Sequence, residues 1–88
     1  MASYKLVLKP SLRKDLRSLP PAMVLRVLQQ FDALSADPLP KSSVKLTGAE
    51  RRYRIRIGDY RIIYEVDHNT QQVVVHYVRH RREAYRNR

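Results

Sequence analysis

The 88-residue sequence contains no cysteine, no tryptophan, one phenylalanine and only two glycines. Without cysteine, neither a disulfide framework nor a thiolate metal site is available. No glycine-rich phosphate loop is present, and no apolar run approaches the ~20 residues of a membrane-spanning helix. The first ten residues lack the apolar core of a signal peptide. We therefore expect a cytoplasmic protein with no membrane association, folded as one domain over residues 1–88.

Acidic residues are also scarce, since eight Asp and Glu stand against 18 Lys and Arg, for a net charge of +10. All five lysines precede residue 50, whereas ten of the thirteen arginines follow it. Arginine is preferred over lysine where planar, bidentate contact with phosphate matters, and it also stacks on bases. This bias favours phosphate recognition. An acidic protein partner and a merely solvated basic surface are the alternatives.

The first half of the chain shows helical spacing after one short strand. Residues 3–8 alternate loosely and predict a strand, and Pro10 suits the first turn of a helix. That helix ends at Pro20 and carries Leu12, Leu16 and Leu19. A second helix is predicted over residues 21–35, with one apolar face formed by Val24, Val27, Leu28, Phe31 and Leu34. The two helices form a hairpin that needs a sheet to pack on.

After a polar connection over residues 41–50, the apolar period changes to two. Tyr53, Ile55 and Ile57 alternate with arginines, and Gly58 and Asp59 predict a tight turn into a strand over residues 60–66. A turn at 67–70 leads into a β-branched run at 72–78, expected as a central strand. Residues 79–88 are expected to form a short helix or arm. The fold class is therefore α+β, with a mainly antiparallel four-stranded sheet, an N-terminal helical hairpin on one face and β-α-α-β-β-β order.

The alternation turns the arginine count into a candidate site. Arg54 and Arg56 are expected to project together from the face of the sheet opposite the helices. Arg61 joins them if it falls on the same side, as its alternation against Tyr60 and Ile62 indicates. Three guanidinium groups on one face repel each other unless an anion lies among them. A phosphodiester is the natural candidate, and a solvated basic face is the alternative.

The C-terminal segment adds His80, a residue type that can transfer protons, Arg81, which can hold a phosphate, and Tyr85, which can stack on a base. No metal or other cofactor is expected, because His76 and His80 lack the glutamate of an H-E-x-x-H motif. Glu50 and Glu65 are expected at the surface or in ion pairs, since neither is paired with a nucleophile.

Together these segments resemble the RelE/ParE toxin superfamily over essentially the whole chain. The resemblance is carried by a G-D-Y-R-I-I-Y hairpin and a late H-R-R-x-x-Y-R pattern, within residues 45–48, 53–64, 73–75 and 79–86. The resemblance implies the toxin of a type II toxin–antitoxin system. For the RelE branch it implies metal-independent cleavage of mRNA in the ribosomal A site, with the ribosome as partner. It also implies a cognate antitoxin, lying over the arginine face or along the helical hairpin, through which the complex would bind operator DNA.

The resemblance also assigns roles. Arg54 and Arg56 match two basic strand residues, Arg61 matches an arginine that contacts the scissile phosphate, and Arg81 and Tyr85 match a late arginine and tyrosine. The expected catalytic set is Arg54, Arg56, Arg61, Arg81, Tyr85 and His80. The expected RNA-binding set is Arg51, Arg52, Lys45, Arg79, Arg82 and Arg86.

The sequence departs from the RelE pattern at three places. The two strand positions are commonly lysine, a basic residue often stands where this chain has Thr47, and the segment between Arg81 and Tyr85 is two residues shorter. Because guanidinium does not release its proton, proton transfer falls to Tyr85, with His80 as a second candidate. Two other functions stay open: gyrase inhibition of the ParE type without RNase activity, and non-catalytic nucleic-acid binding.

Overall fold

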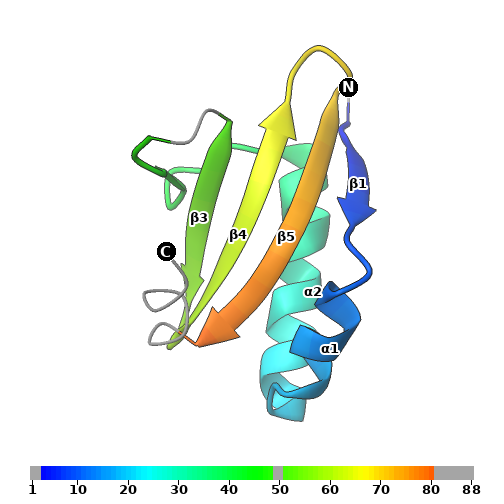
Figure 1. The fold of residues 1–88 in the computed structure, drawn as a ribbon, viewed down its shortest axis with the longest axis vertical. Coiled ribbons are helices and arrows are strands. Elements are labelled where there is room, and N and C mark those ends of the chain that lie inside the picture. Colours follow the sequence, from blue (N-terminus) through cyan, green and yellow to red (C-terminus); the bar gives the residue numbers. More distant parts are fainter. Residues whose placement is uncertain (1–2, 49–50, 81–88) are drawn as a thin grey trace.

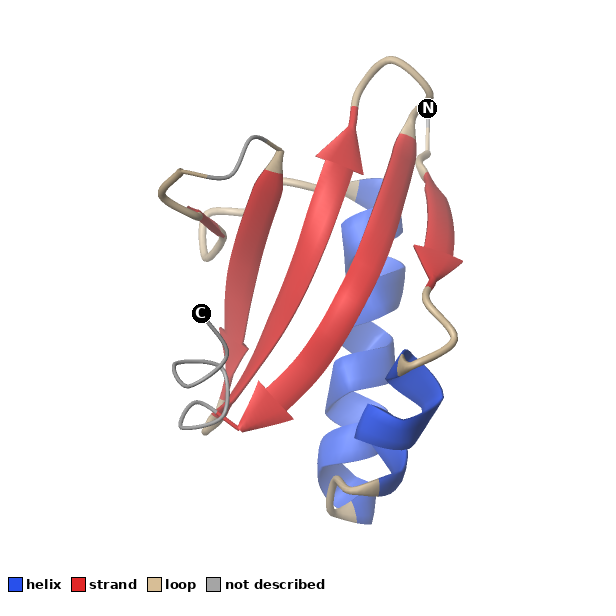
Figure 2. Ribbon diagram, in the orientation of Figure 1, coloured by secondary structure: helices blue, strands red, loops and turns tan. Residues whose placement is uncertain are grey.

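The computed structural model describes residues 3–48 and 51–80. Both helices lie on one face of a curved sheet, and no described helix covers the opposite face, which we call the open face (Figures 1 and 2). This arrangement confirms the α+β class and the helical layer on one face. The elements are, in chain order, β1 (Lys5–Leu8), α1 (Leu12–Arg17), α2 (Pro21–Ala36), β2 (Val44–Lys45), β3 (Arg52–Ile57), β4 (Tyr60–Asp67) and β5 (Gln72–His80).

The sheet has five strands rather than the expected four, in the order β1-β5-β4-β3-β2. The additional strand, β2, lies in the segment expected to be a polar connection, and it pairs only with Tyr53 and Arg54 of β3. Two residues are too few to show alternation, so the pattern could not reveal this strand. All pairs are antiparallel except β1 with β5, which are parallel.

Strand β5 has a neighbour on each side, which confirms its prediction as a central strand. It is two residues longer than expected. Arg79 and His80, assigned from the sequence to a helix or arm, continue the strand and pair with Arg61 and Tyr60 of β4. Because strand residues point alternately to opposite faces, this correction decides where their side chains lie.

The core lies between α2 and the sheet. Val27, Phe31 and Leu34 of α2 are at most 2% exposed, and they pack with the buried side chains of the strands. Leu28, expected on the same face, is 41% exposed. The buried residues follow i, i+4 and i+7 spacing, and Leu28 lies about 100° around the helix from Val27, at the side of this stripe.

Helix α1 covers the part of β5 that β1 leaves open. Strand β1 pairs only with Gln72–Val75. Beyond it, the Val78 amide donates a hydrogen bond to Asp15 Oδ2 at 3.2 Å, from α1. An unpaired strand edge exposes backbone groups that promote association, and α1 closes this one.

A β-bulge interrupts the pairing of β4 with β5. Ile63 lies opposite Tyr77, but Tyr64 lies opposite Val75, so His76 is the extra residue of β5. The bulge lets Val75 and Val78 both reach the core although they are three positions apart. Within the described residues, neither helix is long and apolar enough to cross a membrane.

Candidate nucleic-acid interface

A row of three arginines crosses the sheet on the face opposite the helices. Arg56 of β3 lies opposite Arg61 of β4, and Arg61 lies opposite Arg79 of β5. Their strand neighbours Ile55, Ile57, Ile62 and Val78 are buried in the core, which fixes the arginines on the other face. Directly opposed side chains begin only ~5 Å apart at Cβ. We call this set, Arg56, Arg61 and Arg79, the arginine row.

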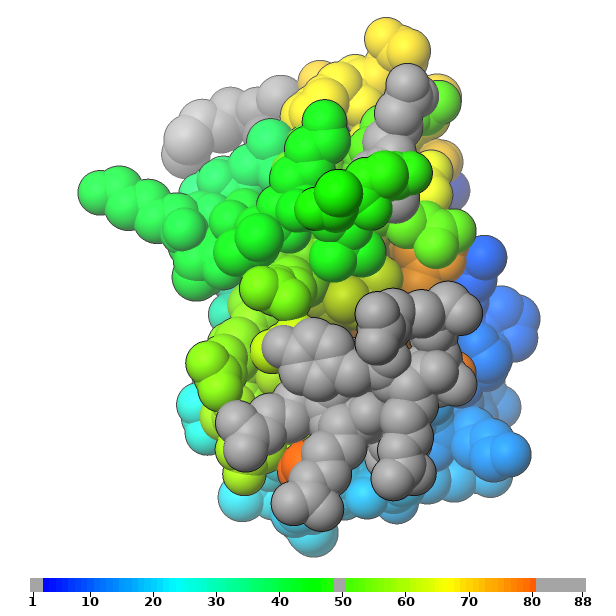
Figure 3. Space-filling view, turned by 60° about the vertical axis from the view of Figure 1, so that its left-hand side comes forward, coloured from blue at the N-terminus to red at the C-terminus, as the bar shows by residue number. Residues whose placement is uncertain are grey.

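Arg54 lies two residues before Arg56 on the same face, so the structure brings together the three strand arginines expected from the sequence. Arg54, Arg56 and Arg61 line one cavity of about 220 Å³, together with Ser42 and Val44. In Figure 3, the green segment that contains these last two residues overhangs the light-green strand β3. No carboxylate is found among the described residues of this wall. A bound anion would therefore relieve the repulsion of three positive charges.

Arg61 is the most enclosed of these groups. It is 8% exposed, and it is the one buried charged residue in the described part of the chain. Because burial removes surrounding water, its attraction for a phosphate in the cavity exceeds that of an exposed arginine.

Tyr77 extends the site on β5. It lies opposite Ile63, on the open face, and the Arg79 guanidinium lies 4.3 Å from the centre of its ring. This cation–π contact orients Arg79 along the sheet. The sequence did not indicate Tyr77, because simple alternation from Val73 and Val75 assigns residue 77 to the core. Only the bulge at His76 turns it outward.

A histidine–carboxylate pair lies near the other end of the same face. His76 Nε2 lies 3.2 Å from Glu65 Oε1, and Glu65 is opposite Arg52. Burial lowers the pKa of His76, and the hydrogen bond to Glu65 works in the opposite direction. Glu65, expected at the surface or in an ion pair, thus has a histidine as its partner.

The structure does not place the His80 ring in the cavity of Arg54, Arg56 and Arg61. The His80 ring contacts the Tyr60 ring edge to face at 5.4 Å. Tyr60 packs against the core on the side of the helices, whereas Arg61 points the other way. The physical reason is that His80 continues β5, in which side chains alternate between the two faces of the sheet. His80 is two residues after the core residue Val78, so it points to the same face as Val78.

Two other expected RNA-binding residues lie away from the cavity. Lys45 is opposite Tyr53, whose ring packs towards the helices, and Arg51 pairs with Asp67 at 3.3 Å. Arg52 is exposed on the open face, two positions from Arg54. The expected site residues Arg81, Arg82, Tyr85 and Arg86, together with Glu50, lie outside the described residues.

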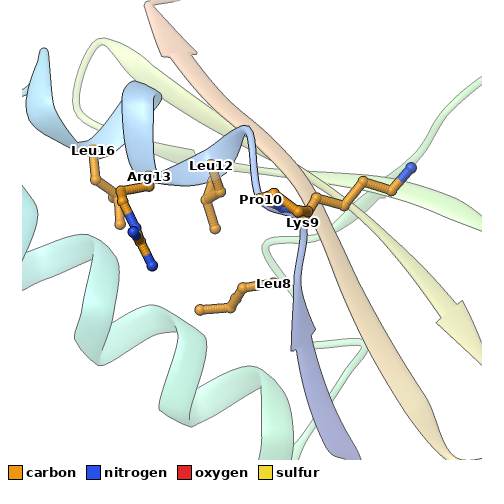
Figure 4. Close-up of a pocket in the computed structure, with 6 residues that line it drawn as sticks. All are labelled: Leu8, Lys9, Pro10, Leu12, Arg13 and Leu16. Carbon is orange, nitrogen blue, oxygen red and sulfur yellow. The ribbon is translucent and has the colours of Figure 1, made fainter.

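Another cavity lies between the end of β1 and α1, with a volume of about 370 Å³. Figure 4 shows the Leu8 side chain pointing into it from β1, across from Leu12 and Leu16 of α1. Its wall is mainly apolar, and Lys9 and Arg13 are its charged residues. Across residues 3–48 and 51–80, no three histidine or carboxylate side chains converge as a metal site would require.

Comparison with known proteins gives consistent matches. Residues 6–85 match the family model of the ParE toxin of type II toxin–antitoxin systems (parDE). The chain is 33% identical to toxin RelG of Mycobacterium tuberculosis over 75 residues, which covers 84% of this chain and 86% of that protein.

Two solved complexes have similar folds. The archaeal RelE–RelB complex from Pyrococcus horikoshii matches with a TM-score of 0.81 and 32% identity, over 90% of this chain and 96% of the solved chain. The RelBE2 toxin–antitoxin complex of M. tuberculosis matches with a TM-score of 0.77 and 30% identity, over 89% and 98%.

Proposed function

The chain belongs to the RelE/ParE superfamily of toxins of type II toxin–antitoxin systems, and we propose that it is an endoribonuclease that cleaves messenger RNA on the ribosome. The observation that carries this proposal is the cavity in which Arg54, Arg56 and Arg61 meet. Three guanidinium groups on adjacent rigid strands match the charge and geometry of a phosphodiester.

In the proposed reaction, the 2′-hydroxyl oxygen attacks the neighbouring phosphorus atom and the bond to the 5′-oxygen breaks. The 2′-hydroxyl loses its proton, the 5′-oxygen gains one, and the products are a 2′,3′-cyclic phosphate and a 5′-hydroxyl end. Placing the reacting groups in line and stabilising charge on phosphorus supply much of the acceleration. The reaction then needs no resident metal ion, since the arginines provide the positive charge.

We propose roles for Arg54, Arg56 and Arg61 from their place in the cavity, and for Arg81 and Tyr85 from the sequence resemblance. Arg61, buried beneath the cavity, and Arg81 hold the scissile phosphate, and Arg54 and Arg56 stabilise the charge that develops in the transition state. Tyr85 orients or deprotonates the 2′-hydroxyl. His80 is the second candidate for proton transfer, although its ring contacts that of Tyr60 on the helix side of the sheet.

The test is expression of the chain without antitoxin, followed by mapping of message ends by primer extension. We expect cuts in codon phase within translated regions. Cleavage at the wild-type rate by both Arg81→Ala and Tyr85→Phe would refute the assignment of the site. Arg17→Leu, which removes an exposed arginine from α1, is the matched control.

Inhibition of DNA gyrase is the second candidate function, and the match to the ParE family model favours it. The same experiment separates the two functions. An SOS response with intact message would support gyrase inhibition and contradict cleavage. The third alternative, non-catalytic nucleic-acid binding, predicts neither message cuts nor growth arrest.

The proposed partners are the ribosome with mRNA in its A site, which places the action in the cytoplasm, and a cognate antitoxin. We place the antitoxin along the helical layer, where Leu8 opens into the apolar cavity and is 45% exposed. Leu25 and Leu28 of α2 add exposed apolar surface, at 65% and 41%. Operator DNA would then be bound through the antitoxin, leaving the arginine face uninvolved.

This placement is tested by co-purification of toxin variants with the antitoxin. We expect Leu8→Asp to weaken the complex and Arg54→Glu to leave it intact. The reverse result would place the antitoxin over the arginine face instead.

A further inference from the structure

A second polar cavity, of about 280 Å³, lies where α2 meets the far end of β3. It is lined by Arg26, Gln29 and Gln30 of α2 and by Arg56 and Ile57 of β3. The three helix residues follow i, i+3 and i+4 spacing, so they share one face of α2. In Figure 3, α2 (cyan) emerges beside the lower end of β3 (light green), at the rim of the molecule.

Arg56 lines both this cavity and the arginine cavity that contains Arg54 and Arg61. Strand β2 pairs with Tyr53 and Arg54 only, so it stops short of Arg56. A ligand that touches Arg56 can therefore continue from the open face of the sheet, around the edge of β3, to the helix face. The two cavities are neighbouring parts of one surface.

The turn after β3 is shaped to let α2 come close. Gly58 has φ +58°, and a Cβ added there would lie 3.3 Å from Met23 Cε and 3.7 Å from Arg26 Nη1. The Arg26 guanidinium is thus held against the β3–β4 turn. It places a second positive charge on the same wall as Arg56, and the described residues of that wall include no carboxylate.

The chemistry of this wall differs from that of the arginine cavity. The side-chain amides of Gln29 and Gln30 each offer hydrogen-bond donors and an acceptor, and they lie on the same wall as two guanidinium groups. Phosphate contacts position a nucleic acid without reading it, whereas side-chain amides hydrogen-bond to base edges, and glutamine pairs in bidentate fashion with adenine. Single-stranded RNA presents such edges freely, because its bases are not paired.

We propose that Arg26, Gln29 and Gln30 form a nucleotide subsite beside the scissile phosphate, in which the two amides read the base and Arg26 contacts its flanking phosphate. The inference rests on the proposed RNase function, and it names the residues that would set sequence preference. Adenine is the base that the amide pair fits best.

The test uses two measurements on the full chain. In the first, message ends are mapped after expression of the wild type and of Gln29→Leu, Gln30→Leu and the double variant. In the second, the affinity of each purified protein is measured for 2′-O-methyl tetranucleotides that differ at one position. These probes cannot be cleaved, because the 2′-oxygen is blocked. Asp32→Asn, an exposed change elsewhere on α2, is the matched control.

We expect the wild type to favour adenine at one position of the tetranucleotide by about tenfold, and the double glutamine variant to lose this preference. Binding to the other tetranucleotides should change less than twofold, and the cut sites in message should become less selective. Arg26→Leu should weaken all tetranucleotides alike. Circular dichroism establishes that each variant is folded.

The outcomes separate the two proposals. If the wild type cuts message and the glutamine variants keep its base preference in both assays, the subsite is wrong and the RNase function stands. If the wild type leaves message intact yet shows a base preference that the glutamine variants lose, the nuclease proposal fails and base reading at this wall survives. Variants that lose antitoxin binding, with base preference unchanged, would assign the wall to a protein partner and overturn the subsite.

Discussion

Guanidinium groups keep their charge at every pH at which the protein folds, and this shapes what each residue of the arginine row can do. Arg61 and Arg56 both line the cavity, but Arg61 is buried and Arg56 is exposed. A buried, planar donor can form two parallel hydrogen bonds to a phosphate, and lysine at the same position cannot.

We therefore predict graded losses at residue 61. Arg61→Leu should lower the single-turnover rate of message cleavage by about a hundredfold or more, as removal of one charge-stabilising donor does elsewhere. Arg61→Lys should retain part of the rate, because it keeps the charge and loses the bidentate geometry. Equal rates for these two variants would contradict a contribution from charge alone, and a wild-type rate for Arg61→Lys would show that the bidentate geometry is irrelevant. Arg17→Leu again serves as the control.

His76 should make stability depend on pH. Burial lowers its pKa in the folded chain, so the folded state holds the neutral ring while the unfolded chain binds a proton below about pH 6.5. Stability should thus fall as the pH drops from about 7.5 towards the folded-state pKa. Urea midpoints measured across this range should show the decline in the wild type. They should show a smaller one in His76→Gln, which can still donate a hydrogen bond to Glu65.

His68→Gln, in the exposed turn before β5, separates this effect from a general response to acid. An identical decline in the wild type and in His76→Gln would rule out His76 as its source.

At the scale of elements, the short helix α1 acts mainly through its contact with β5. Asp15 accepts the Val78 amide hydrogen bond at a point where β1 has already ended. If this amide had no acceptor at the half-covered edge, the folded state would be less stable.

We predict that Asp15→Ala lowers the free energy of unfolding by about 1–2 kcal/mol. Chemical denaturation measures the loss, and Asp32→Ala on the exposed side of α2 is the comparison. Hydrogen exchange of the Val78 amide should also accelerate. Unchanged stability with unchanged exchange would mean that α1 does not protect this edge.

The sequence predicted elements where period and length were both sufficient. It located α2 to within one residue and placed the β3–β4 hairpin with its Gly58 turn, because apolar spacing and turn chemistry agreed there. It missed β2, which is two residues long. It also missed the last two residues of β5, because their polar side chains continue into a polar C-terminal segment with no strand-like alternation.

The prediction of the candidate site was limited in the same way. Arg54, Arg56 and Arg61 were predictable because they alternate with buried residues on adjacent strands. Tyr77 and the position of His80 depend on a bulge and on two further strand residues, and neither leaves a local signal. The subsite on α2 was also missed, because its wall combines residues about 30 positions apart in the sequence.

At the scale of the whole molecule, a net charge of +10 should make RNA binding strongly dependent on salt. Each arginine that contacts a phosphate of single-stranded RNA releases counterions and adds about 0.7 to the slope of log affinity against log salt. We predict that alanine at Arg54, Arg56 and Arg79 together lowers this slope by about 2, as measured by fluorescence anisotropy with a non-cleavable oligonucleotide. A control with three exposed cations of α1 replaced, Arg13, Lys14 and Arg17, should keep the wild-type slope.

The parallel pairing of β1 with β5 has a consequence for when the toxin becomes active. Residues 5–8 find their strand partners only at residues 72–75, so the first strand made during synthesis must wait for the last one. Contacts this distant in sequence form late in folding. The arginine row is complete only when residue 79 is in place, on that same last strand. A nascent or truncated chain that ends before β5 would thus carry most of the positive charge, but it would lack Arg79 and the strand that pairs with β4. We expect the toxin to become active only after β5 has been synthesised.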